Sequence, residues 1–441
     1  MSPEILIVLM FAFVCAGILM GFPVAFTIAG VSLVFGYIGF GSIVFRLVGY
    51  QFTQTVWEFE FVAIPLFVFM GAILERSGVA DGAFGALSQW LRKIRGGLGM
   101  ATILICMLLA ACVGVLGASV STIGLLTLGP LMSRGYDKSL SAGMVAAGGS
   151  LSVLLPPSIV LILFATHVNT HMLKLFLGAV IPGLMLGAGY MLYIGVLSLL
   201  KSGQIPAVVK DDNEPLKYSL AGGLFAFVPI IALIVCVLGA LLLGIATPTE
   251  VAGVGAVGSI VVTAVYKKCS REILLESATN TLLVSTMVIF ITLSAEVFKA
   301  VFFRFGGGRI TKELIADANL GVYGAFALFL ILVFVMGTFI DWMGISLILC
   351  PIFVPILVEL GLDSTHVCIT VLVLLQTSFL TPPFAQSVLY VMGVAPKGLT
   401  ISDAYKGCIP FICIQLIVVV ICIFFPKVVM ILPNLIVTGW N

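Results

Sequence analysis

Apolar runs long enough to cross a lipid bilayer follow one another along almost the whole chain of 441 residues. Hydrophobic residues make up 61% of the chain and charged residues only 9%, whereas a soluble domain carries roughly 25% charged residues. A bilayer-spanning helix needs about 20 apolar residues, and its backbone polar groups must be paired within the chain. The sequence therefore predicts an all-α polytopic membrane protein in contact with a lipid bilayer. It lacks a basic patch suited to nucleic acid.

The longest polar connection, at 201–219, falls near the midpoint of the chain and separates two similar halves. Six of the seven prolines between residues 1 and 200 have a counterpart 225 to 228 residues later. The pairs are Pro3 and Pro229, Pro23 and Pro248, Pro130 and Pro355, Pro156 and Pro382, Pro157 and Pro383, and Pro182 and Pro410. Self-similarity at a fixed spacing indicates an internal repeat. It predicts one repeat at 1–200, a cytoplasmic linker at 201–219 and a second repeat at 220–441.

Each predicted repeat contains six apolar segments. They cover about 4–21, 23–41, 59–75, 97–133, 139–168 and 173–200 in the first repeat, and about 220–246, 248–266, 280–303, 320–359, 365–395 and 405–430 in the second. Two of these segments, 97–133 and 320–359, are too long for one span and carry a break near their middle, so we expect re-entrant hairpins. The segments 139–168 and 365–395 are expected to be broken helices. Five spans and one hairpin per repeat, about ten spans and two hairpins in all, make the second repeat inverted relative to the first.

The distribution of basic residues predicts the orientation in the membrane, because cytoplasmic loops carry an excess of Lys and Arg. With the N-terminus outside, 14 of the 21 Lys and Arg residues fall on the inner side and six on the outer side, with Lys299 left unassigned. The start of the chain, 1–22, is expected to be a first membrane helix, because it has neither a basic leader nor a small-residue cleavage site.

Four breaks are expected at mid-membrane, two in each repeat, at 114–119, 148–158, 337–341 and 376–383. Proline removes a backbone donor, so two in succession leave carbonyl oxygens free. These oxygens, with Ser and Thr hydroxyls, are hard ligands suited to Na⁺, and helix N-termini suit an anion. The sequence predicts two half-sites around one central cavity. The alternative is that the Gly and Pro residues only kink packed helices.

Individual polar residues carry hypotheses of their own. Asp341 lies in an otherwise apolar stretch, where a carboxylate is costly and indicates a functional site. It is expected to bind a cation or to orient the hairpin tip, and a purely structural bond to a neighbouring N–H is the alternative. Glu250 is expected to cap a helix. His167, His171 and His366 lie near span ends and are interpreted as interfacial, because no metal-ligand spacing links them.

No Walker A, G-x-S-x-G or H-E-x-x-H pattern occurs in the sequence. The chain is therefore expected to be neither an enzyme nor an ATPase, and to use an ion gradient or another subunit as its energy source. No organic cofactor is expected.

Short motifs spread along the whole chain resemble one known family. They are Gly21 to Ala25, Ala63 to Phe67, Arg134 to Lys138, Ala147 to Gly149 leading to Pro156-Pro157-Ser158, Ala246 to Glu250, and Thr381-Pro382-Pro383. In this order they resemble the large (M-type, DctM-like) membrane subunit of tripartite ATP-independent periplasmic (TRAP) transporters, within the wider ion-transporter superfamily.

The resemblance implies a function and partners. It implies an elevator mechanism, in which hairpins and broken helices form a moving transport domain against a scaffold domain. It also implies symport with Na⁺ as the coupling ion, a small organic anion (carboxylate or sulfonate) as cargo, and the bacterial or archaeal cytoplasmic (inner) membrane as location. The implied partners are a small four-helix membrane subunit (Q-type) and a periplasmic substrate-binding protein (P-type).

The resemblance also implies site residues. The inner sodium site falls at Gly117, Ala118, Ser119, Ser121, Gly149 and Ser152, and the outer one at Gly337, Thr338, Asp341, Thr377, Ser378 and Thr381. The substrate site falls at Ser119, Ser150, Pro156, Pro157, Ser158, Pro382 and Pro383. Two motifs depart from the family pattern: the usual Ser-Gly-Ser-Ser reads Leu116-Gly117-Ala118-Ser119, and the usual Pro-Pro-Val-Gly reads Pro382-Pro383-Phe384-Ala385.

Two other functions stay open on the sequence. One is a standalone ion-coupled anion carrier of the same superfamily that needs no binding protein. The other is a channel or a structural membrane component, against which the paired broken helices argue.

Overall fold

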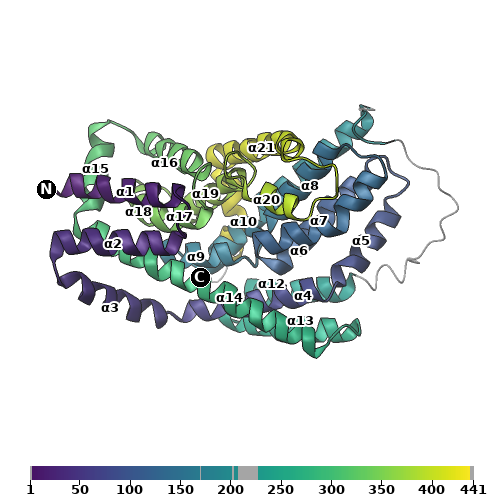
Figure 1. Ribbon diagram of the computed structural model, residues 1–441, viewed down its shortest axis with the longest axis horizontal. Helices are drawn as coiled ribbons and strands as arrows, with labels where there is room; N and C mark the ends of the chain where they lie inside the picture. Colours follow the sequence, from purple (N-terminus) through teal and green to yellow (C-terminus); the bar gives the residue numbers. More distant parts are fainter. Residues whose placement is uncertain (1, 169, 201–202, 207–226, 438–441) are drawn as a thin grey trace.

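The computed structural model describes residues 2–168, 170–200, 203–206 and 227–437 (Figure 1). In the first half the helices are α1 (Pro3–Leu19), α2 (Val24–Phe40), α3 (Ile43–Val56), η1 (Phe59–Val62), α4 (Ala63–Arg76), α5 (Val79–Trp90), α6 (Gly97–Val113), α7 (Leu116–Ser133), α8 (Lys138–Ser150), η2 (Leu151–Val153), α9 (Ile159–Val168) and α10 (Met172–Leu199). In the second half they are α12 (Val228–Leu242), α13 (Pro248–Val265), α14 (Arg271–Arg304), α15 (Gly307–Asp317), α16 (Val322–Gly337), α17 (Trp342–Ile348), α18 (Cys350–Glu359), α19 (Ser364–Ser378), α20 (Gln386–Gly393), α21 (Ile401–Phe424) and α22 (Pro426–Val437).

The predicted all-α fold is confirmed, since the described residues form helices and no strand. Most of the predicted linker at 201–219, and the start of the segment predicted at 220–246, lie outside the described residues.

Membrane-spanning helices are recognised by length and apolar character. Within the described ranges, five helices meet both conditions, namely α7, α10, α13, α14 and α21. Three further pairs of helices meet them together but are bent by more than 40° between their members: α3 with η1 and α4, α15 with α16, and α17 with α18. Many shorter apolar helices, among them α1, α2 and α6, complete the apolar body.

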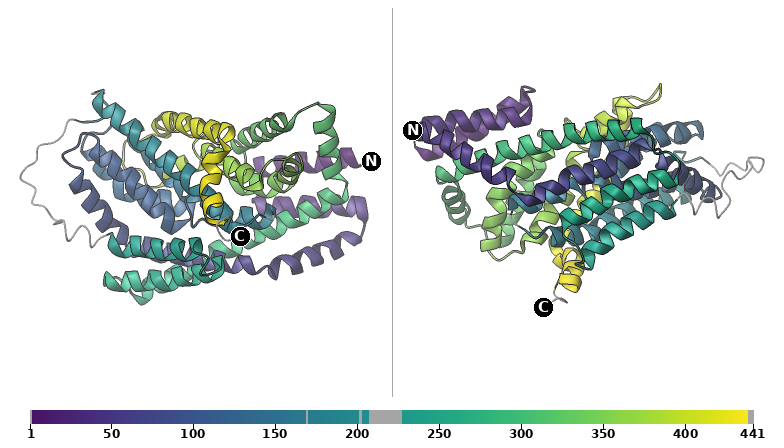
Figure 2. Two further views of the ribbon diagram at one scale, coloured as in Figure 1. Left: turned by 180° about the vertical axis from the view of Figure 1, so that it is seen from behind. Right: turned by 90° about the horizontal axis from the view of Figure 1, so that it is seen from below.

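The helices pack in two groups that each combine both halves of the chain (Figures 1 and 2). In one group α4 packs on α13 and α14, and α14 packs on α2 and α3. In the other group α8 packs on α6, α7, α20 and α21, and α19 packs on α10, α16, α18 and α21. The groups meet where α14 contacts α17 and where α4 contacts α6. Each group is therefore built from helices that are distant in sequence, and the two groups pack against each other.

Small residues allow the two halves to approach closely within the second group. A Cβ on Gly143 of α8 would collide with the carbonyl oxygen of Gly407 on α21, and a Cβ on Gly407 would collide with the carbonyl oxygen of Ser139. The backbones of α8 and α21 are thus in direct contact. In a membrane, where lipid is as apolar as Leu, helix association depends on this kind of close van der Waals packing.

The helices are interrupted at the four places where the sequence predicts breaks. The chain turns between α6 and α7 at Gly114 and Val115, and between α16 and α17 at 338–341. The α8 helix is separated from α9 by Pro156-Pro157, and α19 from α20 by Pro382-Pro383, each joined by a cis peptide bond. The pairs α6 with α7 and α16 with α17 and α18 lie against each other as hairpins.

Some local predictions are wrong or incomplete. The sequence did not predict helix α3, which lies before the segment predicted at 59–75. His171 is exposed, as an interfacial residue would be. His167 and His366, in contrast, lie near helix ends but are buried, and their ring nitrogens contact the carbonyl oxygens of Leu163 (2.7 Å) and Cys422 (2.9 Å). The sequence indicated that these histidines lie near helix ends, but their burial depends on tertiary packing, which local sequence does not show.

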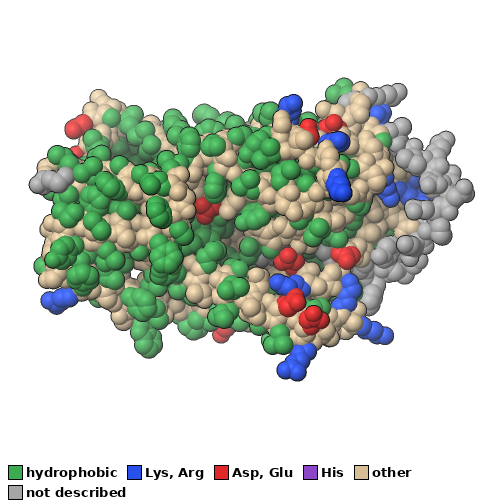
Figure 3. All heavy atoms as spheres, viewed as in Figure 1, with side chains coloured by type: hydrophobic (Ala, Val, Ile, Leu, Met, Phe, Trp, Pro, Cys, Tyr) green, Lys and Arg blue, Asp and Glu red, His purple; other side chains and the backbone are tan. Residues whose placement is uncertain are grey.

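The surface has the charge distribution of a protein embedded in a bilayer. Figure 3 shows hydrophobic side chains over the middle of the molecule, with Lys and Arg gathered mainly toward one end. At that end Arg76 forms an ion pair with Glu276, Lys268 donates to the Gly78 carbonyl (2.8 Å) and Lys138 donates to the Gly398 carbonyl (2.9 Å).

Candidate functional site

The tip of the first hairpin lies against the first Pro-Pro break. Gly114 ends α6 in the left-handed conformation (φ 62°), which glycine adopts without steric cost. A Cβ at this position would lie 3.3 Å from the carbonyl oxygen of Pro157. Beyond the break, Ser158 donates a hydrogen bond to the Val153 carbonyl (2.5 Å) and so closes the loop between α8 and α9. The hairpin tip and the Pro-Pro break are therefore packed directly against each other.

The tip of the second hairpin is built around Asp341. One carboxylate oxygen of Asp341 accepts a hydrogen bond from the N–H of Met343 (3.3 Å) and caps α17, whereas Oδ1 is buried without a hydrogen-bond partner among the described residues. The side chain thus makes the structural bond to a neighbouring N–H that the sequence left open as an alternative. Its second oxygen remains for another ligand. The Phe384 N–H donates to the Thr338 carbonyl (3.2 Å), which joins this tip to the second Pro-Pro break.

The predicted inner-site residues are brought together by the packing of α7 on α8 and η2. A Cβ on Gly149 would come within 2.9 Å of the Cα of Val120, so α7 and α8 are in close contact beside Ser119. The hydroxyls of Ser150 and Ser152 donate to backbone carbonyls of their own segment, at 2.8 and 2.9 Å. Gly117, Ala118 and Ser121 lie on the first two turns of α7.

The predicted outer-site residues also gather in one place. The Ser378 hydroxyl lies directly against Gly337, where a Cβ would collide with it. Thr377 and Thr381 are one turn apart, and the Thr381 hydroxyl donates to the Thr377 carbonyl (2.7 Å). Pro382 and Pro383 are exposed, whereas Pro156 and Pro157 are buried. The two breaks therefore differ in their surroundings.

Several buried polar atoms at the tips and breaks have no hydrogen-bond partner within the described part of the chain. They are Ser119 Oγ, Asp341 Oδ1, Gln376 Nε2 and Oε1, Ser378 Oγ, Gln386 Oε1 and Ser387 Oγ. Buried polar groups in proteins are nearly always paired, so each unpaired one requires an explanation. Most of these atoms are oxygens, which suit a hard cation or water. Within the described residues, no group of three or more His, Cys, Asp or Glu that could hold a metal ion was found.

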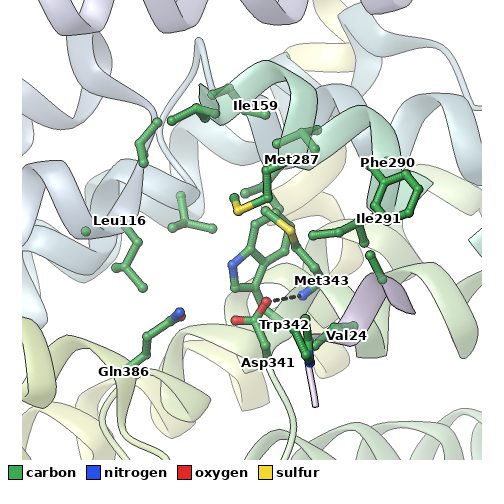
Figure 4. Close-up of a pocket in the computed structure, with 18 of the residues that line it drawn as sticks. Val24, Leu116, Ile159, Met287, Phe290, Ile291, Asp341, Trp342, Met343 and Gln386 are labelled. Atoms are coloured by element: carbon green, nitrogen blue, oxygen red, sulfur yellow. Dashed lines mark hydrogen bonds between the residues drawn. The ribbon is translucent and has the colours of Figure 1, made fainter. Parts of the chain in front are cut away.

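A cavity of about 580 Å³ lies between the two hairpin tips and the long helix α14 (Figure 4). Gly114 to Gly117 line it from the first hairpin, and Asp341 to Met343 from the second. Met287, Phe290 and Ile291 of α14 form a further wall. A Cβ on Gly117 would lie 2.8 Å from the ring of Tyr390, so the first hairpin contacts α20 of the other half beside the cavity.

Two of the predicted sodium ligands, Gly117 and Asp341, line this cavity. The residues predicted to contact substrate do not, although Val153 and Ile159 on either side of the first Pro-Pro break do. Sequence reasoning missed Trp342, Gln386 and Tyr390, which also line the cavity. A polar residue three positions after a Pro-Pro break is a usable signal for Gln386. Nothing local distinguishes Trp342 or the apolar residues of α14 from lipid-facing side chains.

The second departure from the family motif has a structural consequence. Ala385 adopts the left-handed conformation (φ 35°, ψ 59°), which favours glycine because a Cβ crowds the backbone there. The usual motif places Gly at this position. In this chain a buried alanine adopts this left-handed conformation between the Pro-Pro break and α20.

Comparison with known proteins identifies the family. Residues 9–428 match the model of the tripartite ATP-independent periplasmic transporter, DctM component. The chain belongs to this family. It is thus a TRAP transporter large permease, a polytopic membrane protein and not an enzyme, as its sequence predicted.

Named members of the family match nearly the whole chain. The C4-dicarboxylate TRAP transporter large permease DctM of Pseudomonas aeruginosa is 30% identical over 394 residues, which cover 88% of this chain and 90% of that protein. The isethionate TRAP transporter permease DctMQ of Oleidesulfovibrio alaskensis is 29% identical over 432 residues, covering 94% of this chain and 65% of that protein. The 2,3-diketo-L-gulonate permease YiaN of Escherichia coli is 25% identical over 422 residues, covering 95% of this chain and 96% of that protein.

Solved structures show the same kind of fold at low sequence identity. The YdaH transporter of Alcanivorax borkumensis superposes with a TM-score of 0.63 at 14% identity, covering 97% of this chain and 98% of that one. MtrF of Neisseria gonorrhoeae superposes with a TM-score of 0.54 at 15% identity, covering 87% and 85% of the two chains. The TRAP permease therefore has a transporter fold.

Proposed function

We propose that this TRAP permease imports a small organic anion, a carboxylate or a sulfonate, by sodium symport across the bacterial or archaeal cytoplasmic membrane. The observation that carries the proposal is the meeting of two hairpin tips and two broken helices around one cavity, with unpaired buried oxygens beside them. The names of three relatives, which are permeases for C4-dicarboxylate, isethionate and diketogulonate, support an organic acid as cargo.

Two sodium sites follow from this proposal. The inner one uses oxygens of Gly117, Ala118, Ser119 and Ser121 with those of Gly149 and Ser152. The outer one uses Gly337, Thr338 and Asp341 with Thr377, Ser378 and Thr381. Among these proposed ligands, Ser119 Oγ, Asp341 Oδ1 and Ser378 Oγ are buried without a partner in the described part of the chain, and a cation in each site would account for them. The substrate lies in the cavity between the sites, where the lining residues Val153 and Ile159 flank the first Pro-Pro break and adjoin the segment that carries Ser150 and Ser158.

The proposed transport motion is an elevator movement. The group around α8, α19 and both hairpins acts as the transport domain, and the group around α2, α4, α13 and α14 acts as the scaffold. The two repeats, 1–200 and 220–441, are inverted relative to each other, with about ten spans and two re-entrant hairpins in total. Support comes from matched elements, since α6 with α7 corresponds in chain order to α16 with α17 and α18.

The proposed partners are a Q-type small membrane subunit and a P-type binding protein. The DctMQ relative, of which this chain covers 65%, supports a second membrane component. The N-terminus is assigned to the outer side. The end of the molecule where basic side chains gather then faces the cytoplasm.

Uptake into proteoliposomes tests this function. The vesicles hold the permease and its small subunit, with the binding protein outside, with and without an inward sodium gradient. Uptake that requires both sodium and the binding protein is the expected result. Uptake of a verified substrate that ignores sodium contradicts the coupling and directs attention to protons at Asp341.

The same experiment separates the alternative. Sodium-driven uptake without the binding protein indicates a standalone carrier of the same superfamily. Flux that neither saturates with substrate nor depends on a coupling ion indicates a channel.

A further inference from the structure

The walls of the central cavity are amphipathic. Trp342 and Met343 of α17 and Met287, Phe290 and Ile291 of α14 line it with apolar groups. Figure 4 shows Asp341 and Gln386 on the side of the cavity opposite Met287 and Ile159. The charged group thus stands beside Trp342 and Met343, and the α14 wall of the cavity is apolar apart from Thr286.

The charge of the lining is unusual for a site that receives an anion. Among the described residues that line the cavity there is no Lys, Arg or His, and its charged side chain, Asp341, has the same sign as the cargo. An unpaired charge in a low-dielectric site is costly. Two features can stabilise the negative charge of the cargo, and both lie at the hairpin tips. They are the cations at the proposed sodium sites and the first N–H groups of α7, which have no acceptor within their helix.

A diacid fits this lining poorly. One carboxylate placed at the tips would leave the second carboxylate against Met287 and Phe290, without a donor from a charged side chain. A monoanion with an apolar body fits better. Its charged group can lie at the tips, while its apolar body covers the apolar wall and removes the surface of that wall from water. Such burial is favourable in proportion to the area involved.

We infer that this permease transports organic acids with one anionic group on a branched or aromatic body, in preference to C4-dicarboxylates. The inference rests on the proposed function and names the substrate class of that site. The anionic group lies beside the hairpin tips, near Gly117 and Gln386. The body packs between Trp342 and Met287.

The test measures sodium-driven uptake by the complete transporter, made of this chain, its small subunit and its binding protein. The labelled acids are phenylpyruvate, 4-methyl-2-oxopentanoate and succinate. Two variants of α14 form a matched pair. Met287→Ala removes an apolar wall of the cavity, and Leu283→Ala removes an exposed side chain of the same helix that does not line it.

Preferred uptake of the two apolar acids is expected. Met287→Ala is expected to raise their KM at least about fivefold, because the apolar contact between the Met287 side chain and the substrate body is lost, while Leu283→Ala leaves it unchanged. Sodium-driven uptake of succinate in preference to the other acids overturns the substrate class and leaves the proposed function standing. Uptake of the apolar acids with both variants alike overturns the assignment to this cavity. Absence of sodium-driven uptake for every acid overturns the proposed function and this inference together.

Discussion

The hydroxyl of Ser378 lies directly against the α-carbon of Gly337. This contact joins the end of α16, at the tip of the second hairpin, to the end of α19, at the second broken helix. It leaves no room for a side chain at position 337. The proposed outer sodium site is thus held by a contact between two segments that are separated in the sequence and meet only in the fold.

Gly337→Ala is expected to weaken this junction, because the added methyl collides with Ser378. Overpacking of this kind costs about 1–3 kcal/mol. The thermal unfolding midpoint in detergent and sodium-driven uptake should both fall. Gly129→Ala on α7 is the control, since a Cβ there meets nothing within 4 Å. If the two variants had the same unfolding midpoint and the same uptake, the close contact between Gly337 and Ser378 would be contradicted.

Asp341→Asn is expected to reduce sodium-dependent uptake at least about tenfold, a change of about 1.4 kcal/mol. The amide keeps the shape of the cap on α17 but removes the charge offered to a cation, so the protein should remain folded. Kinetics as a function of sodium concentration, together with thermal unfolding, measure the two effects.

Glu250→Gln is the matched carboxylate control for Asp341. Glu250 shares a capping box with Thr247 at the start of α13, which confirms the cap predicted from the sequence. The control should leave sodium dependence unchanged. An Asp341→Asn variant with normal sodium dependence would remove Asp341 from the proposed site.

Gly143→Ala is expected to separate α8 from α21, because its methyl collides with the Gly407 carbonyl. Backbone atoms cannot rotate away as a side chain can, so the helices must shift. We expect a loss of about 1–3 kcal/mol in stability and a lower yield of folded protein. Gly393→Ala, where a Cβ meets nothing within 4 Å, should be neutral. Size-exclusion profiles and thermal unfolding of the two purified variants check this prediction.

Thr122→Val tests a contact between the first hairpin and α4. The Thr122 hydroxyl donates to Glu75 Oε1 (2.8 Å), and its loss leaves a partly buried carboxylate oxygen without this donor. A cost of about 1 kcal/mol is expected, seen as a lower unfolding midpoint. Thr127→Val on the same helix removes only a bond to the Ile123 carbonyl one turn earlier, and should have a smaller effect. The reverse order would contradict a stabilising role for the Glu75 contact.

Ala385→Gly is expected to be tolerated, with an unfolding midpoint no lower than that of the natural chain. The left-handed conformation of Ala385 costs roughly 1–2 kcal/mol for a residue with a Cβ, which offsets the lost methyl packing. Ala179→Gly within α10 is the control, since glycine in a helix costs roughly 0.5–1 kcal/mol relative to alanine. A larger loss at position 385 than at position 179 would show that the methyl packing matters more than the backbone conformation.

Much of the fold could be predicted from the sequence, because its strongest signals are local. Apolar runs of bilayer length predict helices, and the Pro-Pro pairs interrupt them, although single prolines such as Pro130, Pro182 and Pro410 lie inside continuous helices. The positions of the two hairpin turns and the two Pro-Pro breaks therefore follow from Gly114, Asp341, Pro156 and Pro382 with few alternatives. Helix α3 was not predicted, because Arg46, Gln51 and Gln54 interrupt its apolar residues.

The candidate site could be predicted only in part. Asp341 was identified because a carboxylate in an apolar stretch is conspicuous, and Gly117 because it lies in a motif. Trp342 and Met287 could not be identified in this way, since in a membrane protein an apolar side chain looks the same in sequence whether it faces lipid, another helix or a cavity. Burial of His366 was missed because its ring contacts the Cys422 carbonyl, which is far away in sequence.

The sequence by itself determined that this chain is a helical membrane protein, where its helices break, and which family its motifs resemble. The tertiary structure decided which broken ends meet, which polar atoms stay unpaired and which walls enclose the cavity. The physical reason is that hydropathy and proline act on the nearest turn of the chain, whereas a cavity depends on contacts such as that between Gly117 and Tyr390, which are far apart in sequence.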